Sequence, residues 1–229
     1  MTALTETLPT RDYRPYARPA WRRALFTRES AVIALLLIVI IVALATVRNF
    51  DSPLTVTFLL RDLAPILLIA LPMALIIITE EIDLSVASIV GLTSVTTGIL
   101  VQAGVPMALA AIAAILVGTL AGAFNGFLIT VVGLPSLAVT IGTLALFRGI
   151  AVGLLGTSTV TDFPKGWTDL AKANIPGTPI PMIIIPFVVL AIIFAVLLHF
   201  TPFGRSLFAI GLNKEAAQFS GIDVGRTKF

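Results

Sequence analysis

The sequence predicts an all-α protein, a polytopic bundle of about six transmembrane helices followed by a short cytoplasmic helix near the C-terminus. Three observations predict this fold class. Apolar residues make up 58% of the 229 residues and charged residues only 12%, about half the share found in an ordinary soluble domain. The mean hydropathy of +1.06 leaves too little polar surface to cover a water-soluble fold. Several apolar segments, separated by polar or proline-containing stretches, approach the length that crosses a bilayer.

The residue inventory excludes several kinds of chemical site. Cysteine is absent, so this chain forms no disulfide, iron–sulfur cluster or thiolate zinc site. The single histidine, His199, stands at the inner end of an apolar segment and provides no HExxH-type metal site. The dipeptide Gly-Lys does not occur, which excludes a P-loop. We therefore expect no catalytic residue, no metal site and no cofactor here, and any ATP that the protein's work requires would be bound by a partner subunit.

A basic tail and an apolar segment begin the chain. Residues 1–30 carry six arginines against three acidic residues, and their prolines argue against a helix. Basic flanks of a first span stay inside the cell, so this tail is predicted to be cytoplasmic. Residues 31–47 are uninterrupted apolar sequence and predict the first span. Arg22-Arg23 and Ala43-Leu44-Ala45 would also fit a cleaved signal peptide, which we disfavour because further hydrophobic spans follow.

The second and third spans are predicted at 63–79 and 84–103. The second contains Pro65 and Pro72, which membrane helices tolerate when neighbouring groups satisfy the freed carbonyls. Between the two spans, residues 80–83 hold three carboxylates. An acidic inner turn and a broken or re-entrant helix both fit this stretch, because irregular backbone is allowed at membrane depth where protein surrounds it.

Three further spans complete the transmembrane domain, which covers residues 31–200. They are predicted at 106–132, 135–155 and 180–200. A polar loop at 156–179 separates the last two and is expected outside the cell. It either meets a protein partner outside the cell or is an ordinary solvated loop whose tryptophan seeks the membrane surface.

The distribution of basic residues supports six crossings. The segment 201–229 carries four Lys or Arg, whereas the predicted outer loops 48–62 and 156–179 carry two each. Together with the six arginines of the tail, this pattern places both ends of the chain in the cytoplasm, as the positive-inside rule requires. We therefore expect a multi-pass protein of the cytoplasmic (inner) membrane.

Polar residues within the apolar segments are candidates for a polar pathway or for helix packing. Asp83 either caps the third span or orders a broken helix. Asn125 lies among glycines at spacing four, which permits close helix crossing with the amide as a hydrogen-bonding bridge. Arg148 would snorkel to the outer interface, neutralise a helix terminus or contact a solute. The complete candidate set is Asp83, Ser85, Asn125, Ser136, Thr140, Thr143 and Arg148.

Three hydroxyl residues of this set form one stripe on the fifth span. Ser136, Thr140 and Thr143 recur at helical spacing, so their side chains share one face. Such a stripe would either face a polar pathway or donate hydrogen bonds back to the carbonyls of its own helix. The sequence leaves these two interpretations open.

A short helix is predicted on the cytoplasmic side at 214–220. Asn213 is a good N-cap, and Gly221 is placed for a left-handed C-cap. The helix would present Ala216, Ala217 and Phe219. From the residues alone it is either an amphipathic helix resting on the membrane or a docking helix for a soluble partner.

Four motifs follow one another over about 80–229. They are Glu81–Ser88; Gly122–Gly126; Pro135–Thr143 with Arg148-Gly149; and Glu215–Gly221 after the lead-in Thr201–Gly211. In this order they resemble G-x-I-D-L-S-V-G-S, G-A-x-N-G, P-x-x-x-V-T-L-G-T…R-G and EAA-x-x-x-G of ABC importer permeases, specifically the monosaccharide branch with its ribose, rhamnose and autoinducer-2 permeases. Their wording is closest to rhamnose permeases.

The resemblance implies an ATP-driven importer of a monosaccharide such as rhamnose, with no covalent chemistry in the permease itself. It implies a cytoplasmic ABC ATPase, a second permease chain and an external sugar-binding protein as partners, and no nucleic acid. The ATPase would dock on a coupling helix formed by Asn213, Lys214, Glu215, Ala216, Ala217, Gln218, Phe219 and Gly221. Family members continue for about four more spans beyond this point, so the resemblance also implies a C-terminally incomplete sequence.

Three other functions are weighed against this one. An intramembrane enzyme would need a nucleophile–base pair or facing aspartates, and only Asp83 lies near a span. A secondary transporter would need buried charges for ion coupling and internal repeats, which the sequence does not show. A truncated, non-transporting subunit that only binds an ATPase or a partner permease is the strongest alternative.

Overall fold

The computed structural model describes residues 28–229, and these form α-helices joined by loops, with one isolated β-bridge between Asn174 and Pro181. The predicted all-α fold class is confirmed. The predicted tail at 1–30 lies almost entirely outside the described residues. The chain divides into two compact units, residues 1–52 and 53–229, and each is described by itself.

The described part of the first unit is one apolar helix, α2 (Arg28–Thr46), at the position of the first predicted span. From Val32 to Val47 its large apolar side chains are exposed around the whole helix. A helix that is apolar on every side has no polar face to turn towards water, so its surface is suited to lipid.

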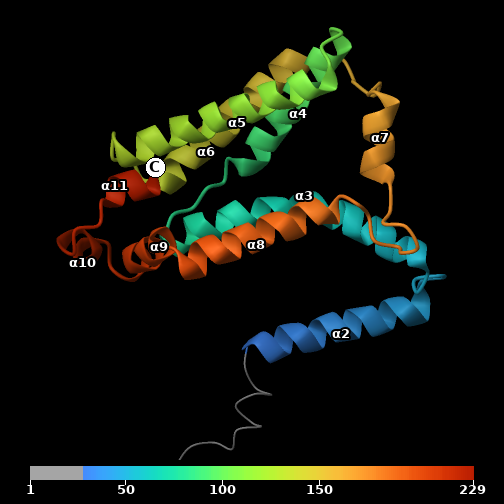
Figure 1. The fold of residues 1–229 in the computed structure, drawn as a ribbon, viewed down its shortest axis with the longest axis horizontal. Coiled ribbons are helices and arrows are strands. Elements are labelled where there is room, and N and C mark those ends of the chain that lie inside the picture. The colour runs from blue at the N-terminus through green and yellow to red at the C-terminus, as the bar shows by residue number, and fades with distance from the viewer. Residues whose placement is uncertain (1–27) are drawn as a thin grey trace, which may run out of the picture. The chain divides into compact units, whose positions relative to one another are not determined.

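The second unit contains the other predicted spans as helices, drawn as coiled ribbons in Figure 1. Among the described residues, α3, α5 and α6 are each long and apolar enough to cross a membrane. The pair α8 and α9, bent by 70°, passes the same test as a fourth span, whereas α2 and α4 are shorter apolar helices. The bounds are α3 (Pro53–Ile78), α4 (Val86–Gln102), α5 (Met107–Thr130), α6 (Ser136–Leu155), α8 (Ile184–Phe200) and α9 (Pro202–Leu212).

The start of the second span is predicted wrongly. Helix α3 begins at Pro53, ten residues before the predicted start at residue 63, and it passes through the part of the sequence assigned to an outer loop. A proline is favourable in the first turn of a helix, where its missing N–H has no partner to lose. The charge of Arg61 is accommodated because its guanidinium donates hydrogen bonds to the Lys172 carbonyl and to Asn174 Oδ1, the second over 3.1 Å.

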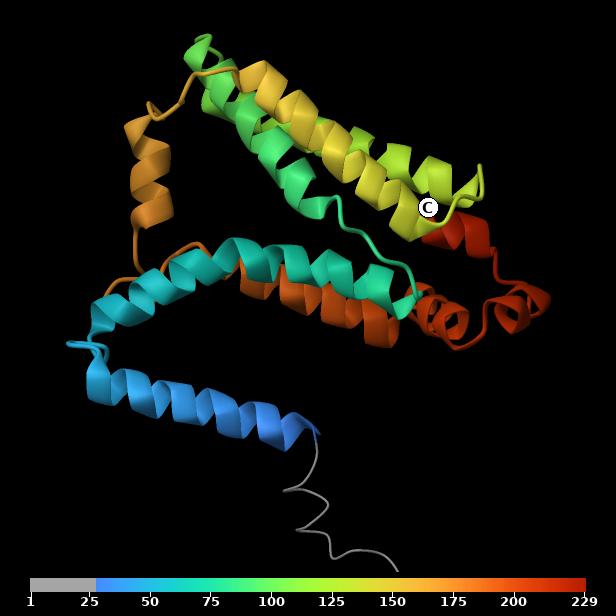
Figure 2. The same ribbon diagram turned by 180° about the vertical axis from the view of Figure 1, so that it is seen from behind.

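Helices α4, α5 and α6 form one layer, with α4 packed against both of the others (Figures 1 and 2). The buried core between these three helices is made of Leu92 from α4, Ala121 from α5, and Phe147 and Ala151 from α6. The close approach of α4 and α5 depends on Gly118, because a Cβ there would lie 3.3 Å from Thr93 Cγ2. Small residues at the contact allow this packing, as is usual between membrane helices.

Helices α3 and α8 pack side by side, and α9 turns back against the end of α3. The bend between α8 and α9 follows from the local sequence. Thr201 Oγ1 donates to Leu197 O over 2.5 Å and accepts from Gly204 N over 3.3 Å, while Pro202 begins the new helix. A Cβ on Gly204 would overlap the Leu198 carbonyl, and one on Gly211 would overlap the carbonyl oxygen of Ile78. Glycine is therefore required at both contacts.

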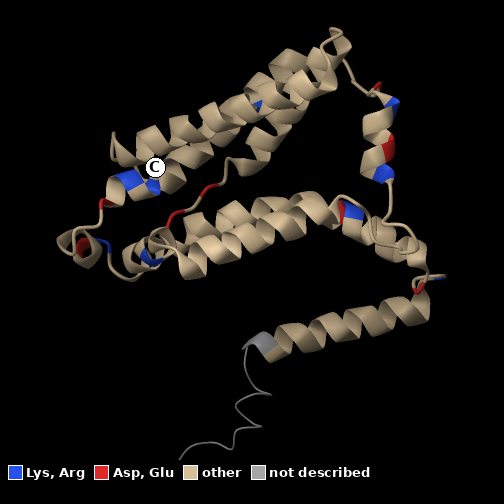
Figure 3. Cartoon of the chain, in the orientation of Figure 1, with Lys and Arg blue, Asp and Glu red and all other residues tan. Residues whose placement is uncertain are grey.

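The polar segment between α6 and α8 contains the helix α7 (Lys165–Lys172) and a hairpin-like loop. Figure 3 shows charged residues on α7, on the loops and on the C-terminal helices, while the long apolar helices carry few. The loop is attached to α3, because Thr57 Oγ1 donates to Pro179 O over 2.6 Å and Arg61 donates to the last residue of α7, Lys172, and to Asn174.

Candidate functional site

The connection between α3 and α4 is a non-helical segment, residues 79–85, and four helices contribute to its surroundings. It begins where α3 ends in a left-handed turn at Glu80, whose φ is +61°. The Glu80 and Glu81 amides donate to the carbonyls of Ile77 and Ile76 over 3.0 and 3.2 Å, which closes the helix. Glycine is the usual residue in such a left-handed cap, and Glu80 occupies the position of the first glycine in the family motif G-x-I-D-L-S.

A buried polar network joins this segment to α5. Asp83 Oδ1 accepts hydrogen bonds from the backbone N–H and the hydroxyl of Ser85 over 2.8 and 2.7 Å. The Ser85 hydroxyl in turn accepts from Asn125 Nδ2 over 2.8 Å. Ser85 is fully buried and Asn125 is 4% exposed. Asp83 therefore forms a local turn just before α4 rather than bonding directly to its first helical residues, and the network fixes this turn against α5.

Helix α6 holds the same segment from the other side. The Ile82 N–H donates to Ser136 Oγ over 3.4 Å, and Thr140 Oγ1 donates to the Ile82 carbonyl over 3.1 Å. Thr140 Oγ1 also lies 2.8 Å from the Ser136 carbonyl of its own helix. Both backbone groups of Ile82 are therefore paired with side chains of α6, which holds this non-helical stretch in place.

The remaining two candidates do not reach the segment. Thr143 is buried and donates to the Val139 carbonyl of its own helix over 3.1 Å. The side chain of Arg148 is exposed and lines a separate cavity of about 290 Å³ with Ser88 and Gly91. Among the described residues Arg148 forms no ion pair. The three hydroxyl residues predicted to form one stripe on α6 therefore have different partners. Ser136 and Thr140 bind the segment 79–85, whereas Thr143 bonds only to its own helix.

The predicted short helix near the C-terminus is α10 (Lys214–Phe219), followed by α11 (Val224–Lys228). Asn213 Oδ1 accepts from the Ala216 N–H over 2.9 Å at its start. At its end Gly221 has a φ of +86°, and its N–H donates to Gln218 O over 3.0 Å. The Ile222 N–H donates to Ala217 O over 3.1 Å, which completes a Schellman cap. Both ends of this helix are therefore fixed by their own sequence.

One part of the prediction for α10 is wrong. Ala217 was expected on the presented face, but it is 3% exposed and packs with Ile210 of α9 and Val224 of α11. A six-residue helix has one inward face, and Ala217 is the residue on it. The outward face carries Glu215, Ala216 and Phe219, of which Phe219 is 91% exposed. Lys214 and Gln218 are exposed as well.

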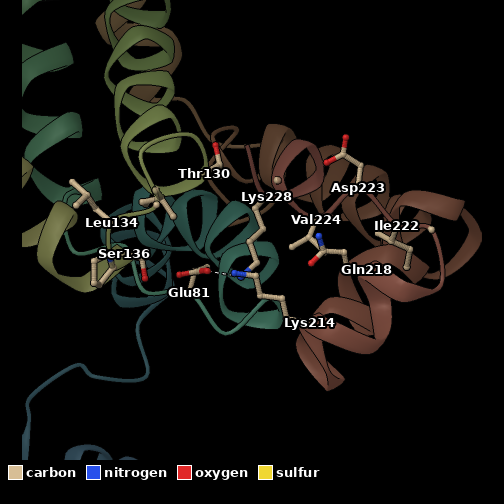
Figure 4. Close-up of a pocket in the computed structure, with 15 residues that line it drawn as sticks. Glu81, Thr130, Leu134, Ser136, Lys214, Gln218, Ile222, Asp223, Val224 and Lys228 are labelled. Carbon is tan, nitrogen blue, oxygen red and sulfur yellow. Dashed lines mark hydrogen bonds and ion pairs between the residues drawn. The ribbon is translucent and has the colours of Figure 1, made fainter.

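An ion pair connects these C-terminal helices to the segment between α3 and α4. Lys228 Nζ of α11 binds Glu81 Oε1, and Lys214 of α10 lies beside the pair (Figure 4). The pair borders a cavity of about 720 Å³ between the C-terminal helices and the turn from α5 to α6. Burial raises the pKa of Glu81, but the bonds to Lys228 and Ser136 and the charge of Lys214 outweigh it, so the pKa lies below its usual value.

Comparison with known proteins places this arrangement in a family. Residues 55–229 match the family described as the permease component of branched-chain amino acid transport systems. The chain belongs to this permease family. The resemblance to importer permeases that the four motifs predict is thereby confirmed.

Two curated relatives of the chain are named as permease proteins of autoinducer 2 import systems. The autoinducer 2 import system permease protein LsrD of Yersinia enterocolitica is 37% identical over 219 residues, which cover 93% of this chain and 63% of the relative. The LsrD protein of Salmonella typhimurium is 36% identical over 216 residues, covering 91% and 64%. The chain thus spans slightly less than two thirds of these relatives' length. No solved structure matches it. The relatives give no support to the closer likeness to rhamnose permeases.

Several residues of the site were missed by sequence reasoning. In the sequence Lys228 is one of four basic residues of 201–229, and in the structure it binds a carboxylate 147 positions earlier. The motif resemblance includes Gly204 and Gly211 but gives them no physical role, and in the structure both are close-contact positions. A signal for the two glycines was present, since both lie in the segment Thr201–Gly211, which resembles the lead-in of importer permeases. The sequence contains no comparable signal for Lys228.

Proposed function

We propose that this chain is the permease subunit of an ATP-driven importer that moves a small polyhydroxylated solute, of the autoinducer-2 or monosaccharide type, across the cytoplasmic membrane. The relatives named for autoinducer-2 import and the four motifs support this solute class. ATP is bound and hydrolysed by a separate ATPase, and this subunit carries out no covalent chemistry. A second permease chain and an external binding protein complete the transporter, and the N-terminus lies in the cytoplasm.

The observation that carries the proposal is the continuous set of contacts from α10 through α11 to the polar segment 79–85. Glu215 and Phe219 are exposed on α10 and available to an ATPase, while Ala217 locks the helix to α9 and α11. Helix α11 then reaches segment 79–85 through Lys228 and Glu81. A displacement of α10 by the ATPase is therefore transmitted as a movement of packed elements rather than absorbed by a loop.

The same segment is the means by which the displacement would reach the membrane helices. Its backbone is held by α5 through Ser85 and Asn125 and by α6 through Ser136 and Thr140. Moving it therefore changes the positions of α4, α5 and α6 relative to α3. The ATPase drives this change only if it binds α10 differently in its two nucleotide states.

The decisive experiment combines copurification with uptake. Cells that carry the native gene and its partner genes are tested for uptake of labelled autoinducer-2, D-ribose and L-rhamnose. Replacing Phe219 with Ala and Glu215 with Ala should abolish copurification of the ATPase and reduce uptake to background. The matched control is Asp169→Asn on α7, which should change neither.

Each outcome separates the proposed function from its main rival. Uptake that depends on Glu215 and Phe219 supports the importer. Copurification of the ATPase without uptake of any solute would indicate a non-transporting subunit. If the double variant copurifies with the ATPase as well as the wild type does, α10 is not the docking helix.

A further inference from the structure

The amide of Asn125 has a fixed orientation, which follows from the single proton of the Ser85 hydroxyl. That hydroxyl donates to Asp83 Oδ1 over 2.7 Å, so it has only lone pairs to offer Asn125. The group that faces it at 2.8 Å must therefore be the NH₂ of Asn125, and the carbonyl oxygen Oδ1 must point the other way.

The carbonyl oxygen of Asn125 is buried and accepts no hydrogen bond from any described residue. The whole residue is 4% exposed. Natural proteins rarely leave such an acceptor without a donor, so each case requires an explanation. Asp83 can also accept further hydrogen bonds. Its Oδ1 accepts both bonds from Ser85, while its second carboxylate oxygen accepts none from the described residues.

Both residues line one cavity of about 480 Å³, a volume typical of small-ligand sites, which measure roughly 300–1,000 Å³. Leu75 and Ile76 of α3 give it an apolar wall, and Arg226 and Lys228 of α11 line it as well. On α5 the space beside Asn125 is left open by Gly122, because a Cβ there would have no atom within 4 Å. Gly122 therefore serves the cavity rather than a helix crossing.

We propose that this cavity is a binding subsite for the transported solute, in which Asn125 Oδ1 and the free Asp83 oxygen accept hydrogen bonds from two of its hydroxyl groups. The apolar wall would cover the C–H face of the solute. An amide oxygen and a carboxylate oxygen both accept hydrogen bonds from hydroxyl groups, which fits a polyol. This inference rests on the proposed function for the identity of the solute.

The first test uses the absence of cysteine from the chain. A Gly122→Cys variant carries a single thiol inside the cavity, and Gly166→Cys on α7 carries one outside it. Both positions have open space for a side chain. In the purified protein, millimolar autoinducer-2, D-ribose or L-rhamnose should slow modification of Gly122→Cys by a charged thiol reagent at least about fivefold, with no effect on Gly166→Cys.

The second test asks whether Asn125 itself contacts a hydroxyl. Uptake of the transported solute is compared with that of its monodeoxy analogues, in wild type, in Asn125→Leu and in the control Thr96→Val. Thr96 donates only to Leu92 O of its own helix. One analogue should show a KM raised about tenfold in wild type, and that penalty should disappear in Asn125→Leu. Thr96→Val should keep the wild-type pattern.

The outcomes distinguish the inference from the proposed function. If a solute that the wild type transports does not protect Gly122→Cys, the inference is overturned, but the proposed importer function is not contradicted. A deoxy penalty that persists in Asn125→Leu would mean that a group other than Asn125 binds this hydroxyl, which also overturns the inference. If the wild type takes up none of the three solutes, the proposed function fails, and protection of Gly122→Cys alone then decides the inference.

Discussion

Lys228 and Glu81 lie 147 residues apart in the sequence and form an ion pair at the junction of α11 with the segment between α3 and α4. Their side chains are 10% and 23% exposed, so the pair is sheltered from solvent more than most surface pairs. Ser136 and Lys214 add to the stabilisation of the carboxylate. The C-terminal helices are therefore attached to the site by charge as well as by apolar packing.

This attachment should weaken in acid. The pKa of Glu81 in the folded chain is below its ordinary value of 4.5, so its charged form contributes stability above that pH. The contribution is lost as the pH falls below about 4.5 and through the folded pKa. The protection factors of the α11 amides against hydrogen exchange, which correct for the slower intrinsic exchange in acid, should therefore fall below this pH.

A substitution tests the same pair at neutral pH. Glu81→Gln should accelerate exchange in α11 at pH 7 by about tenfold, which corresponds to roughly 1.4 kcal/mol, and should remove the acid response. Asp162→Asn in the loop before α7 serves as the control for loss of one carboxylate elsewhere. Unchanged exchange in Glu81→Gln would show that apolar packing alone holds α11.

Gly211 should be one of the least replaceable residues of the chain. A Cβ at this position would overlap the Ile78 carbonyl at the end of α3, and backbone cannot move aside as a flexible side chain does. Gly211→Ala should lower the free energy of unfolding by roughly 2 kcal/mol or more, measured by denaturant titration in detergent. Gly142→Ala on α6 is the matched control, because a Cβ there meets nothing within 4 Å, and it should be neutral or stabilising.

Glu80 is a position at which a substitution should stabilise the folded chain. Its backbone is left-handed, with a φ of +61°, a conformation that costs an L-residue about 1 kcal/mol relative to glycine. Glu80→Gly should raise the free energy of unfolding by up to about 1 kcal/mol. Gly133→Ala, at a φ of +81°, should lower it by a similar amount. A destabilising Glu80→Gly would indicate that the carboxylate makes a contact that outweighs the strain.

The features that the sequence predicted correctly are those determined locally. Apolar runs gave the positions of the membrane helices, and Asn213 with Gly221 gave the limits of α10, because a cap depends on residues only a few positions apart. The start of α3 was missed because a distant loop provides the partners of Arg61. The burial of Ala217 was missed for the same kind of reason, since it depends on α9 and α11.

The candidate site shows the same division. Asp83, Asn125 and Thr140 were selected because polar groups are unusual in apolar segments, and the structure brings all three to one segment. The sequence did not indicate which of them would meet. Pairing of Thr140 with the Ile82 carbonyl and of Lys228 with Glu81 depends on how separate helices pack, and spacing along the chain does not determine it.

Helix α7 is expected to lie at the outer membrane surface. Trp167 and Leu170 are three residues apart, share one face and are 47% and 57% exposed, while Lys165 and Lys172 stand at the two ends of the helix. The helix follows the end of α6 and precedes α8, so both neighbours bring it to the membrane boundary. An apolar face with tryptophan and flanking lysines is typical of interfacial helices.

Tryptophan fluorescence measures this directly, because the chain has only two tryptophans. In a Trp21→Phe variant reconstituted in lipid, Trp167 should emit at short wavelength and be quenched by lipids brominated near the headgroups. Lipids brominated at the chain ends should quench it less, since the helix lies in the interface and not in the core. Adding Leu170→Lys should reverse the shift by removing half of the apolar face. Long-wavelength emission that brominated lipid leaves unchanged would place α7 in water, and its exposed face would then be free for a protein partner.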